Sequence, residues 1–271
     1  MSDAIAAFTG SVPEYYHQYL GPVIFVDAAA DMARRAVAAG GERLLETAAG
    51  TGIVTRALHD ALPAGTAITA TDLNPAMLAV AESKLEGCGR ITFRPADGTD
   101  LPFPDQSFDT VVCQFGVMFY PDKARGYREA LRVLRPGGRY LFSVWDSHRY
   151  NHYAGIAHRV AGEAFPDNPP RFLGVPYGYS AIDPIKEALI EAGFRIISAT
   201  VLRIDRPVAD LVAFATGFVF GTPLFGQIQE RDPAAHASVR DRIVAAWQRE
   251  YGGLSATLPL QAIMFEAHRP A

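Results

Sequence analysis

Apolar runs alternate with amphipathic helical segments through the first half of this 271-residue chain. The runs have the length and β-branched content of buried strands, and the segments between them have helical spacing. The expected strands are 43–48, 67–71, 91–95, 109–114 and 139–145, and the expected helices between them are 53–62, 75–86 and 123–134. Strands that alternate with helices are typical of an α/β fold, with a doubly wound, mostly parallel sheet.

Local signals mark the ends of these elements. Asn74 and Pro75 provide an N-cap and a proline at the first helical position. The sequence Arg135-Pro136-Gly137-Gly138 predicts that the third helix stops and that the chain turns into a strand. In the second half, a helix is expected at 182–192 and strands at 194–204 and 258–267.

Three segments rich in aromatic residues fit no part of this sheet. Long excursions from the carboxyl ends of strands can cover the ligand site of an open α/β sheet, so we expect these segments to form the substrate pocket. The predicted organisation is an N-terminal helical lid segment at 1–40, a Rossmann-like core at 41–146, a cap insertion at 147–181, a core helix and strand at 182–205, a cap or lid insertion at 206–256, and a final core strand at 257–271.

Three acidic residues follow three successive strands. Glu46 precedes the glycine pair Gly50 and Gly52, Asp72 comes twenty residues after that pair, and Asp97 follows the third strand. Glycine lets a ligand approach the backbone, and an acid in the place of Asp72 accepts hydrogen bonds from a ribose diol. A nucleoside ligand with polar groups at both ends is therefore expected.

Charge favours a cationic nucleoside over a dinucleotide such as NAD. A pyrophosphate about 4 Å from the Glu46 carboxylate would cost on the order of 4 kcal/mol at an intermediate dielectric. Position 55 is Thr, where the dinucleotide fingerprint has Gly or Ala. S-adenosylmethionine has the adenosine and a cationic methionine part, and it has no phosphate.

Four segments together resemble the class I S-adenosylmethionine-dependent methyltransferases, and in particular the type 11 branch similar to ubiquinone and menaquinone biosynthesis methyltransferases. They are LLETAAGTG, ATDLNPAML, FRPADGTDLPFPDQSFDTVVCQFGVMFYPD and REALRVLRPGGRYLFSVWD, within residues 40–146. The resemblance implies a seven-stranded Rossmann-like sheet whose last strand is antiparallel. One departure is Ala48, which stands where the family has its first loop glycine, and its methyl group weakens binding if that position needs a positive φ.

The resemblance also assigns the cofactor contacts. Glu46, Ala48, Gly50 and Gly52 would surround the methionine end, and Asp72 would bind the ribose hydroxyls. The adenine would contact Leu73, Met77, Asp97, Gly98 and Thr99. Gln114 would lie where the methyl group emerges, and Tyr15 and Tyr19 would close over the sulfonium.

For the substrate side we predict contacts from Phe115, Phe119, Trp145, Tyr177 and Phe218, although most aromatic residues of the caps are expected to be core. If a phenolic acceptor needs a general base, His17 and His152 are the candidates. His148 and His152 are spaced i, i+4, but no carboxylate completes a metal-binding pattern, so no metal is expected.

Composition excludes several other classes. Charged residues make up 20% of the chain and the net charge is −4, which leaves no electrostatic footprint for nucleic acid. After the fourth strand the chain reads Gln114-Phe115-Gly116-Val117, without the Asn/Asp-Pro-Pro-aromatic motif of nucleic-acid amino-methyltransferases. Two cysteines and an N-terminus without a signal-peptide pattern predict a cytoplasmic protein.

The uncharged segment 211–229 has two interpretations. Its glycines and a proline argue against a spanning helix, so no stable membrane insertion is expected. It is either a buried cap helix followed by a turn, or a mobile lid that admits a lipophilic substrate.

We therefore expect methyl transfer to a small apolar or aromatic acceptor by in-line displacement, with S-adenosyl-L-homocysteine as the product. The pattern does not select among O, N, S and C acceptors, and it gives no oligomeric state. The alternative is a catalytically silent regulator that binds S-adenosylmethionine or S-adenosylhomocysteine on the same fold.

Overall fold

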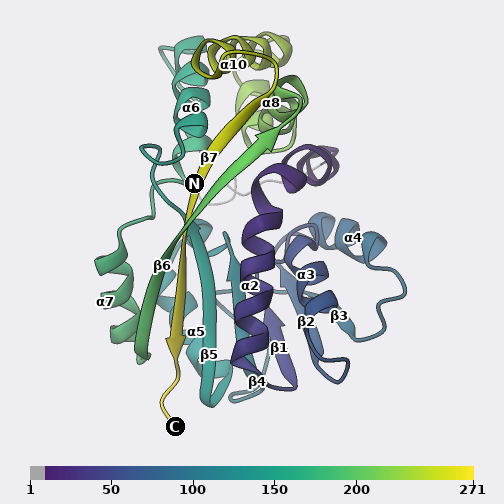
Figure 1. Ribbon diagram of the computed structural model, residues 1–271, viewed down its shortest axis with the longest axis vertical. Helices are drawn as coiled ribbons and strands as arrows, with labels where there is room; N and C mark the ends of the chain where they lie inside the picture. Colours follow the sequence, from purple (N-terminus) through teal and green to yellow (C-terminus); the bar gives the residue numbers. More distant parts are fainter. Residues whose placement is uncertain (1–9) are drawn as a thin grey trace. The chain divides into compact units, whose positions relative to one another are not determined.

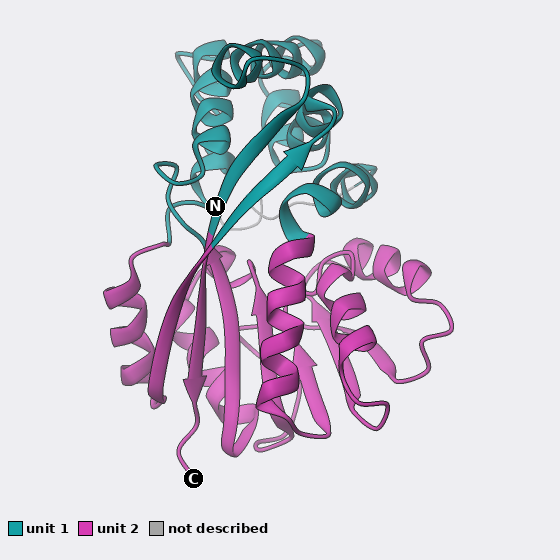
Figure 2. Cartoon of the chain, in the orientation of Figure 1, with its two compact units in different colours: residues 1–25, 145–179, 203–261 teal, residues 26–144, 180–202, 262–271 magenta. Residues whose placement is uncertain are grey.

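The computed structural model describes residues 10–271, and the chain divides into two compact units (Figures 1 and 2). Of the described residues, unit 1 comprises 10–25, 145–179 and 203–261, and unit 2 comprises 26–144, 180–202 and 262–271. The chain passes from one unit to the other between Phe25 and Val26, between Tyr179 and Ser180, and within three long strands.

A seven-stranded sheet has the order β3-β2-β1-β4-β5-β7-β6. Its strands are β1 (Arg43–Glu46), β2 (Ala67–Asp72), β3 (Ile91–Pro95), β4 (Phe108–Gln114), β5 (Leu134–Trp145), β6 (Arg195–Val208) and β7 (Ala256–His268). The pairs β1–β2, β1–β4, β2–β3 and β4–β5 are parallel, with Leu44 opposite Ile68 and Thr110. The doubly wound α/β class predicted from the hydrophobic pattern is confirmed.

The last strand runs against its neighbour. The Arg269 N–H donates to the Gly138 carbonyl at 2.9 Å, and eight residues farther along β5 the Asp146 N–H donates to the Gln261 carbonyl at 3.0 Å. From the first bond to the second, the residue number rises by eight on β5 and falls by eight on the β7 side. This pattern defines an antiparallel pair. This agrees with the antiparallel last strand that the resemblance implied.

The predicted stop of the third helix before Arg135 is confirmed, but the turn expected at 135–138 is wrong, because these residues already belong to β5. Leu134 pairs with Phe108, and the register shifts between Phe108 and Thr110. Gly137 has φ +77°, and a Cβ on Gly138 would lie 2.8 Å from the carbonyl oxygens of Arg135 and Asp109. The glycines therefore allow an irregular β-strand segment rather than a turn before it.

Five α-helices accompany the sheet in unit 2: α2 (Val26–Ala39), α3 (Ile53–Ala61), α4 (Pro75–Lys84), α5 (Lys123–Val133) and α7 (Ile182–Ala192). Met32 of α2 and Leu58 of α3 are fully buried in one core cluster with Leu44 of β1. Burial of such side chains stabilises by roughly 1.5–3 kcal/mol each. One face of α2 thus packs in the core of unit 2, and the predicted 1–40 lid segment is too long at its C-terminal end.

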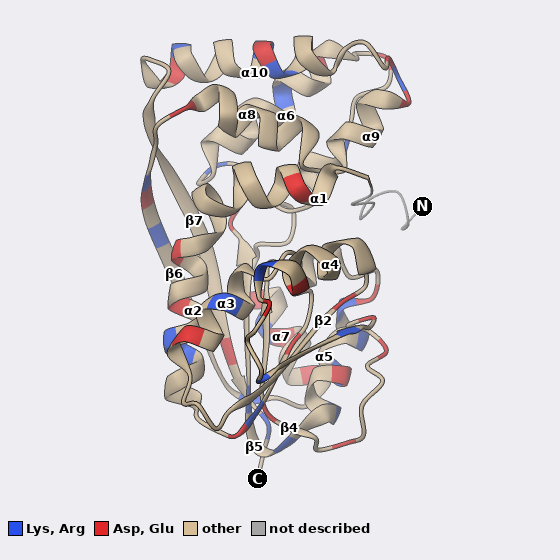
Figure 3. Ribbon diagram, turned by 90° about the vertical axis from the view of Figure 1, so that its right-hand side faces the viewer, with Lys and Arg blue, Asp and Glu red and all other residues tan. Residues whose placement is uncertain are grey.

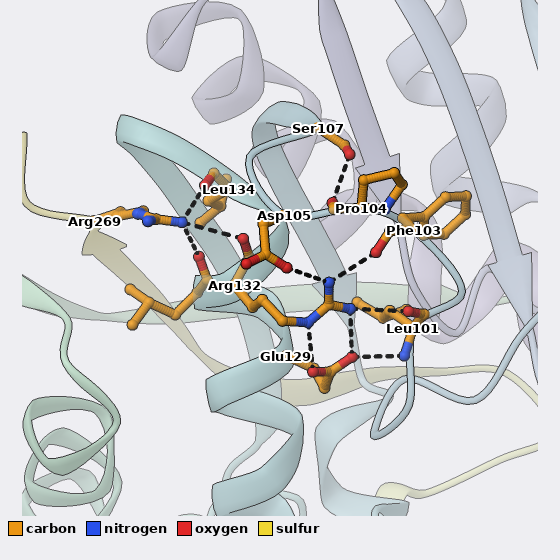
Figure 4. Close-up of polar contacts among 10 residues, drawn as sticks. Leu101, Phe103, Pro104, Asp105, Ser107, Glu129, Arg132, Leu134 and Arg269 are labelled. Atoms are coloured by element: carbon orange, nitrogen blue, oxygen red, sulfur yellow. Dashed lines mark hydrogen bonds and ion pairs between the residues drawn. The ribbon is translucent and has the colours of Figure 1, made fainter.

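An arginine network fixes the connection between β3 and β4 to α5 (Figure 4). The Arg132 guanidinium donates to both Glu129 carboxylate oxygens and to the carbonyls of Leu101 and Phe103. The Leu101 N–H donates to Glu129 in return. The Arg132 side chain holds the pKa of Glu129 below its usual value. The network anchors the segment that follows Asp97.

Unit 1 is a group of helices around an aromatic core. They are α1 (Val12–Tyr15), the π-helical segment η1 (Tyr16–Phe25), α6 (His152–Ala164), the 3₁₀ turn η3 (Phe172–Gly174), α8 (Leu211–Phe220), α9 (Leu224–Gln229) and α10 (His236–Tyr251). The fully buried Trp247 of α10 donates its indole N–H to the Tyr153 carbonyl at 2.8 Å, and its ring stacks on Phe214 at a centroid distance of 5.1 Å.

The uncharged segment 211–229 forms α8 and α9, and most of its large side chains are buried. A Cβ on Gly217 would lie 2.8 Å from the Tyr19 Cβ, so this glycine lets α8 approach η1 closely. The buried-helix interpretation is therefore confirmed, whereas the lid role stays a prediction. Within residues 10–271, no helix is long and apolar enough to cross a membrane. In the view of Figure 3, acidic and basic residues are interspersed along the visible elements.

Candidate cofactor site

The predicted acids lie at the carboxyl ends of neighbouring strands in unit 2. Glu46 is the last residue of β1 and Asp72 the last of β2, whereas Asp97 follows β3 by two residues. Gln114 ends β4 on the other side of β1. These four strands are parallel neighbours, so the residues share one edge of the sheet, where open α/β folds bind ligands.

Asp72 is held by two backbone donors. One carboxylate oxygen accepts from the Gly50 N–H and the other from the Asn74 N–H, each at 2.8 Å. Burial raises the pKa of Asp72, and these two hydrogen bonds oppose that shift. A carboxylate offers about four acceptor positions, so both oxygens retain capacity for a ribose diol. The Asp72 carboxylate is thus held in one orientation as a hydrogen-bond acceptor.

Gly50 and Gly52, in the loop after β1, lie in different surroundings. Gly50 has φ +57°, and a Cβ there would meet only the Met77 Cε, at 3.5 Å. Gly52 has φ +82°, and a Cβ there would lie 2.9 Å from a Leu85 methyl carbon and 3.0 Å from the Ala81 Cβ. Gly52 therefore serves the packing of α3 against α4 and not only the approach of a ligand.

Glu46 is a buried carboxyl group with an unused acceptor. It is 1% exposed, and its Oε2 atom has no hydrogen-bond partner among the described residues. Burial raises its pKa to about 8; the neighbouring Asp72 adds to this rise, while Thr55 in the first turn of α3 opposes it. An unpaired buried acceptor is costly, and a ligand ammonium group would satisfy it. This atom fits the cationic methionine part of S-adenosylmethionine.

The same pKa weakens one argument drawn from the sequence. Repulsion of a pyrophosphate required an ionised Glu46, but with a pKa of about 8 most of the ligand-free protein carries a neutral Glu46 at pH 7. Burial next to Asp72 is a tertiary effect that the spacing of the acids does not reveal. The preference for a cation comes instead from the energy gained when a cation stabilises the ionised carboxylate.

The turn after β3 is ordered by its own side chains. One Asp97 oxygen accepts from the Thr99 N–H at 2.7 Å and from the Thr99 hydroxyl at 2.8 Å. Thr99 is buried, and its hydroxyl group orients the Asp97 carboxylate. Thr99 therefore supports Asp97, which is the predicted contact to the adenine amine. Leu73 is 65% exposed, as an apolar surface for one face of an adenine would be, and Met77 is buried beside Gly50.

Ala48 has φ +53°, the conformation that favours the family's glycine at this position. A non-glycine residue there carries backbone strain. Its Cβ lies 2.4 Å from where a Cβ on Gly116 would be. The absence of a side chain at Gly116 therefore makes room for the extra methyl group on the loop.

Two predicted substrate contacts lie just after β4. Phe115 also has positive φ, +55°; it is buried, and its N–H donates to the Ser143 carbonyl at 3.0 Å. Phe119 ends the 3₁₀ turn η2 (Val117–Phe119) and is half-buried. Both residues follow Gln114 at the sheet edge, and their substrate contact stays a prediction.

The other predicted contacts belong to unit 1, where ring packing occupies them. Tyr15 and Tyr19 stack at 5.7 Å, and Tyr15 also meets Phe220 at 5.7 Å. Phe218 is buried against Tyr153 and Trp247. Trp145 and Tyr177 are buried and 6.2 Å apart. Trp145, Tyr177 and Phe218 are thus largely buried, and their contact with a substrate stays a prediction.

The histidines fall into two environments. His152 has a 54% exposed side chain and pairs with Glu250 at 3.3 Å, which places this predicted base on the surface of unit 1. His17 lies in η1 and is half-buried. No group of three or more His, Cys, Asp or Glu side chains within residues 10–271 is arranged to hold a metal ion.

His148, considered from the sequence only for its i, i+4 spacing with His152, belongs to a half-buried aromatic cluster. Its Nε2 lies 3.0 Å from the Leu173 carbonyl, and its ring stacks on His158 at 5.3 Å and meets Tyr177 at 4.8 Å. Burial lowers the pKa of His148 and of His158, so both rings are neutral at pH 7. His148 lies three residues after Trp145, the last residue of β5, and this position was the sequence signal for the cluster.

Comparison with known proteins gives the same family as the four sequence segments. Residues 45–142 match a family model described as a methyltransferase domain. A demethylmenaquinone methyltransferase of Clavibacter sepedonicus is 46% identical over 114 residues, which are 42% of this chain and 45% of that protein. The ubiquinone/menaquinone biosynthesis C-methyltransferase UbiE of Pasteurella multocida is 32% identical over 194 residues, 66% of this chain and 70% of that protein.

A solved structure shares the fold. Phosphoethanolamine N-methyltransferase 2 of Haemonchus contortus, in complex with S-adenosyl-L-methionine, superposes with a TM-score of 0.60 at 19% identity, over 96% of this chain and 57% of that chain. The chain spans a little under half the length of the first curated relatives it matches, 45% and 44%. Residues 45–142, which match the family model, lie within unit 2.

Proposed function

This chain belongs to the S-adenosylmethionine-dependent methyltransferases that include the ubiquinone/menaquinone biosynthesis enzymes, and we propose that it transfers a methyl group to a small apolar or aromatic acceptor. The observation that carries the proposal is the pair of acids on β1 and β2. Asp72 is fixed by two backbone N–H groups, and Glu46 is buried with an unpaired oxygen beside it. This pair matches a ribose diol and an ammonium group in one ligand.

The protein's part in the reaction is mainly alignment. S-adenosylmethionine supplies an activated methyl group on a sulfonium leaving group. Glu46 would hold the ammonium group, Asp72 the ribose and Asp97 the adenine amine. Orientation of the acceptor about 3–3.5 Å from the methyl carbon, with water excluded, removes roughly 7–11 kcal/mol of barrier. No residue with unusual reactivity is required at this edge.

The acceptor is proposed to be a ring carbon of a quinone-type molecule. The support is that relatives are named demethylmenaquinone and ubiquinone/menaquinone biosynthesis methyltransferases. The aromatic composition of unit 1 agrees with an apolar acceptor, since pockets for such molecules are lined by apolar and aromatic side chains.

Calorimetry with S-adenosylmethionine, S-adenosylhomocysteine and NAD tests the cofactor. Micromolar binding of the first two and none of NAD is expected. Asp72→Asn should weaken binding about 100-fold, because two charged hydrogen bonds to the ribose are lost. Asp60→Asn is the control, since Asp60 is an exposed aspartate on α3. Binding of NAD, or equal affinity of the two variants, would contradict the assignment.

A second assay tests the acceptor. Reduced demethylmenaquinone and a demethylated ubiquinone precursor are incubated with the protein and the cofactor, and the products are analysed by mass spectrometry. The expected result is the gain of one methyl group on carbon with release of S-adenosylhomocysteine. Cofactor binding without methylation of any quinol, phenol, thiol or amine would favour the silent regulator.

A further inference from the structure

Tyr120, which follows η2, connects the loop after β1 with the end of β4, two segments that are far apart in the sequence. Its hydroxyl donates to the Thr47 hydroxyl oxygen at 3.2 Å and lies 3.6 Å from the Cys113 sulfur. Thr47 is buried in the loop after β1, and Cys113 is fully buried in β4. A single phenol group thus joins the β1 loop to the end of β4. Burial holds its pKa well above the ordinary value, so it remains a proton donor.

The ring of Tyr120 occupies the space of two absent side chains. A Cβ on Gly98 would lie 2.2 Å from the Tyr120 hydroxyl oxygen, and a Cβ on Gly126 would lie 2.5 Å from the ring Cδ2. Neither glycine has a positive φ, so the requirement is for space and not for an unusual backbone conformation. The ring therefore packs directly on the turn after β3 and on α5.

Of the residues that Tyr120 contacts, Thr47 is a chain neighbour of predicted ligand contacts and Gly98 is itself a predicted one. Thr47 lies between Glu46 and Ala48, and Gly98 lies between Asp97 and Thr99. Asp97 and Thr99 make their turn around Gly98, and the Thr47 N–H is tied to the Val112 carbonyl at 2.9 Å. A shift of either segment would change the distance between the methionine end and the adenine end of one ligand.

We propose that Tyr120 is a positioning residue of the cofactor site, which sets the β1 loop and the β3 turn at the spacing that an adenosine with its methionine part requires. The inference rests on the proposed function. Tyr120 makes no contact with the ligand in this role and acts through Thr47 and Gly98. A site that is present but displaced by about 1 Å loses much of its affinity or rate.

The test compares hydroxyl deletions. Tyr120→Phe keeps the ring and removes the donor, Thr47→Val removes the acceptor, and Thr47→Ser keeps it. Tyr127→Phe is the matched control, because Tyr127 is a buried tyrosine on α5 that packs on Tyr140 and Phe142. Melting temperature and the dissociation constants of S-adenosylhomocysteine and adenosine are measured for each.

Tyr120→Phe and Thr47→Val should each weaken S-adenosylhomocysteine about 3- to 10-fold, the range for one hydrogen bond, whereas Thr47→Ser should bind like the unaltered protein. The double variant should be no weaker than either single one, because both remove the same contact. Tyr127→Phe should leave affinity unchanged even where it lowers the melting temperature.

A lower melting temperature of Tyr120→Phe with unchanged affinity would reduce Tyr120 to a core side chain and overturn the inference. An equal loss of affinity in Tyr127→Phe would overturn it as well, since the effect would then be general. If the unaltered protein binds no S-adenosylhomocysteine, the proposed function fails and this inference fails with it. Binding with no difference among variants defeats only the inference.

Discussion

The cofactor edge of unit 2 and the aromatic interior of unit 1 hold their candidate functional groups in different ways. Asp72 and Asp97 are fixed by N–H groups from neighbours in their own loops or the next one. Tyr153, Phe218 and Trp247 are fixed by contacts among rings from α6, α8 and α10. Two of these three hydrogen bonds span only two residues of the chain, whereas the ring packing joins segments far apart in it.

The largest effect is expected from a substitution that creates a cavity in unit 1, which should lower stability without changing cofactor affinity. Phe218→Ala removes a buried ring between Tyr153 and Trp247 and should lower the free energy of unfolding by about 3–5 kcal/mol. Urea denaturation measures this loss. S-adenosylhomocysteine affinity of the folded fraction should stay within twofold, and a large loss of affinity would show that the regions are coupled.

Glu46→Gln tests whether an ionisable carboxyl group in unit 2 controls cofactor affinity. In the unaltered protein a cation binds best to the ionised carboxylate, so affinity for S-adenosylmethionine should rise between pH 6 and pH 8, by up to tenfold per pH unit, and level off above the pKa of about 8. The variant should bind more weakly and lose this rise. Calorimetry in buffers of different ionisation heat also detects the proton released on binding.

The same variant has an opposite effect on stability. The pKa of Glu46 is higher in the folded protein than the value of 4.5 expected on unfolding, so the ligand-free protein is destabilised as pH rises from about 4.5 to 8. Glu46→Gln removes this loss and should raise the melting temperature at pH 8 by several degrees, with little change at pH 4.5. A variant less stable at pH 8 would contradict the buried, unpaired state of Glu46.

A smaller effect is expected from Gly98→Ala. The added methyl group collides with the Tyr120 hydroxyl and should cost about 1–3 kcal/mol in stability, with a several-fold loss of cofactor affinity. Gly65→Ala is the control, because a Cβ there meets nothing within 4 Å. Chemical denaturation and calorimetry compare the two variants, and equal behaviour would exclude a tight contact at Gly98.

The least change is expected from His152→Ala. The exposed pair with Glu250 contributes roughly 0–1 kcal/mol, and a surface histidine is poorly placed as a base. Turnover should remain within twofold once an acceptor is known. A loss of turnover above tenfold would restore His152 as the base that the sequence suggested.

The α/β class, the positions of the strands and the three acids were predictable from the sequence, because each depends on short-range patterns of hydrophobicity, glycine and charge. Asn74 illustrates this: its side chain accepts from the Ala76 N–H, as its position before Pro75 predicted. The turn at 135–138 failed because a glycine pair permits both a turn and an irregular strand, and pairing with β4 and β7 decides between them.

The raised pKa of Glu46, the division of the N-terminal segment at Phe25 and the contacts of Tyr120 follow from the folded structure and not from local sequence patterns. Burial next to a second acid, packing of α2 on the sheet, and space left by glycines at 98 and 126 all involve residues distant in the chain. Sequence patterns report what a residue can do locally. The free energy of its surroundings, which sets pKa values and packing, exists only after the chain has folded.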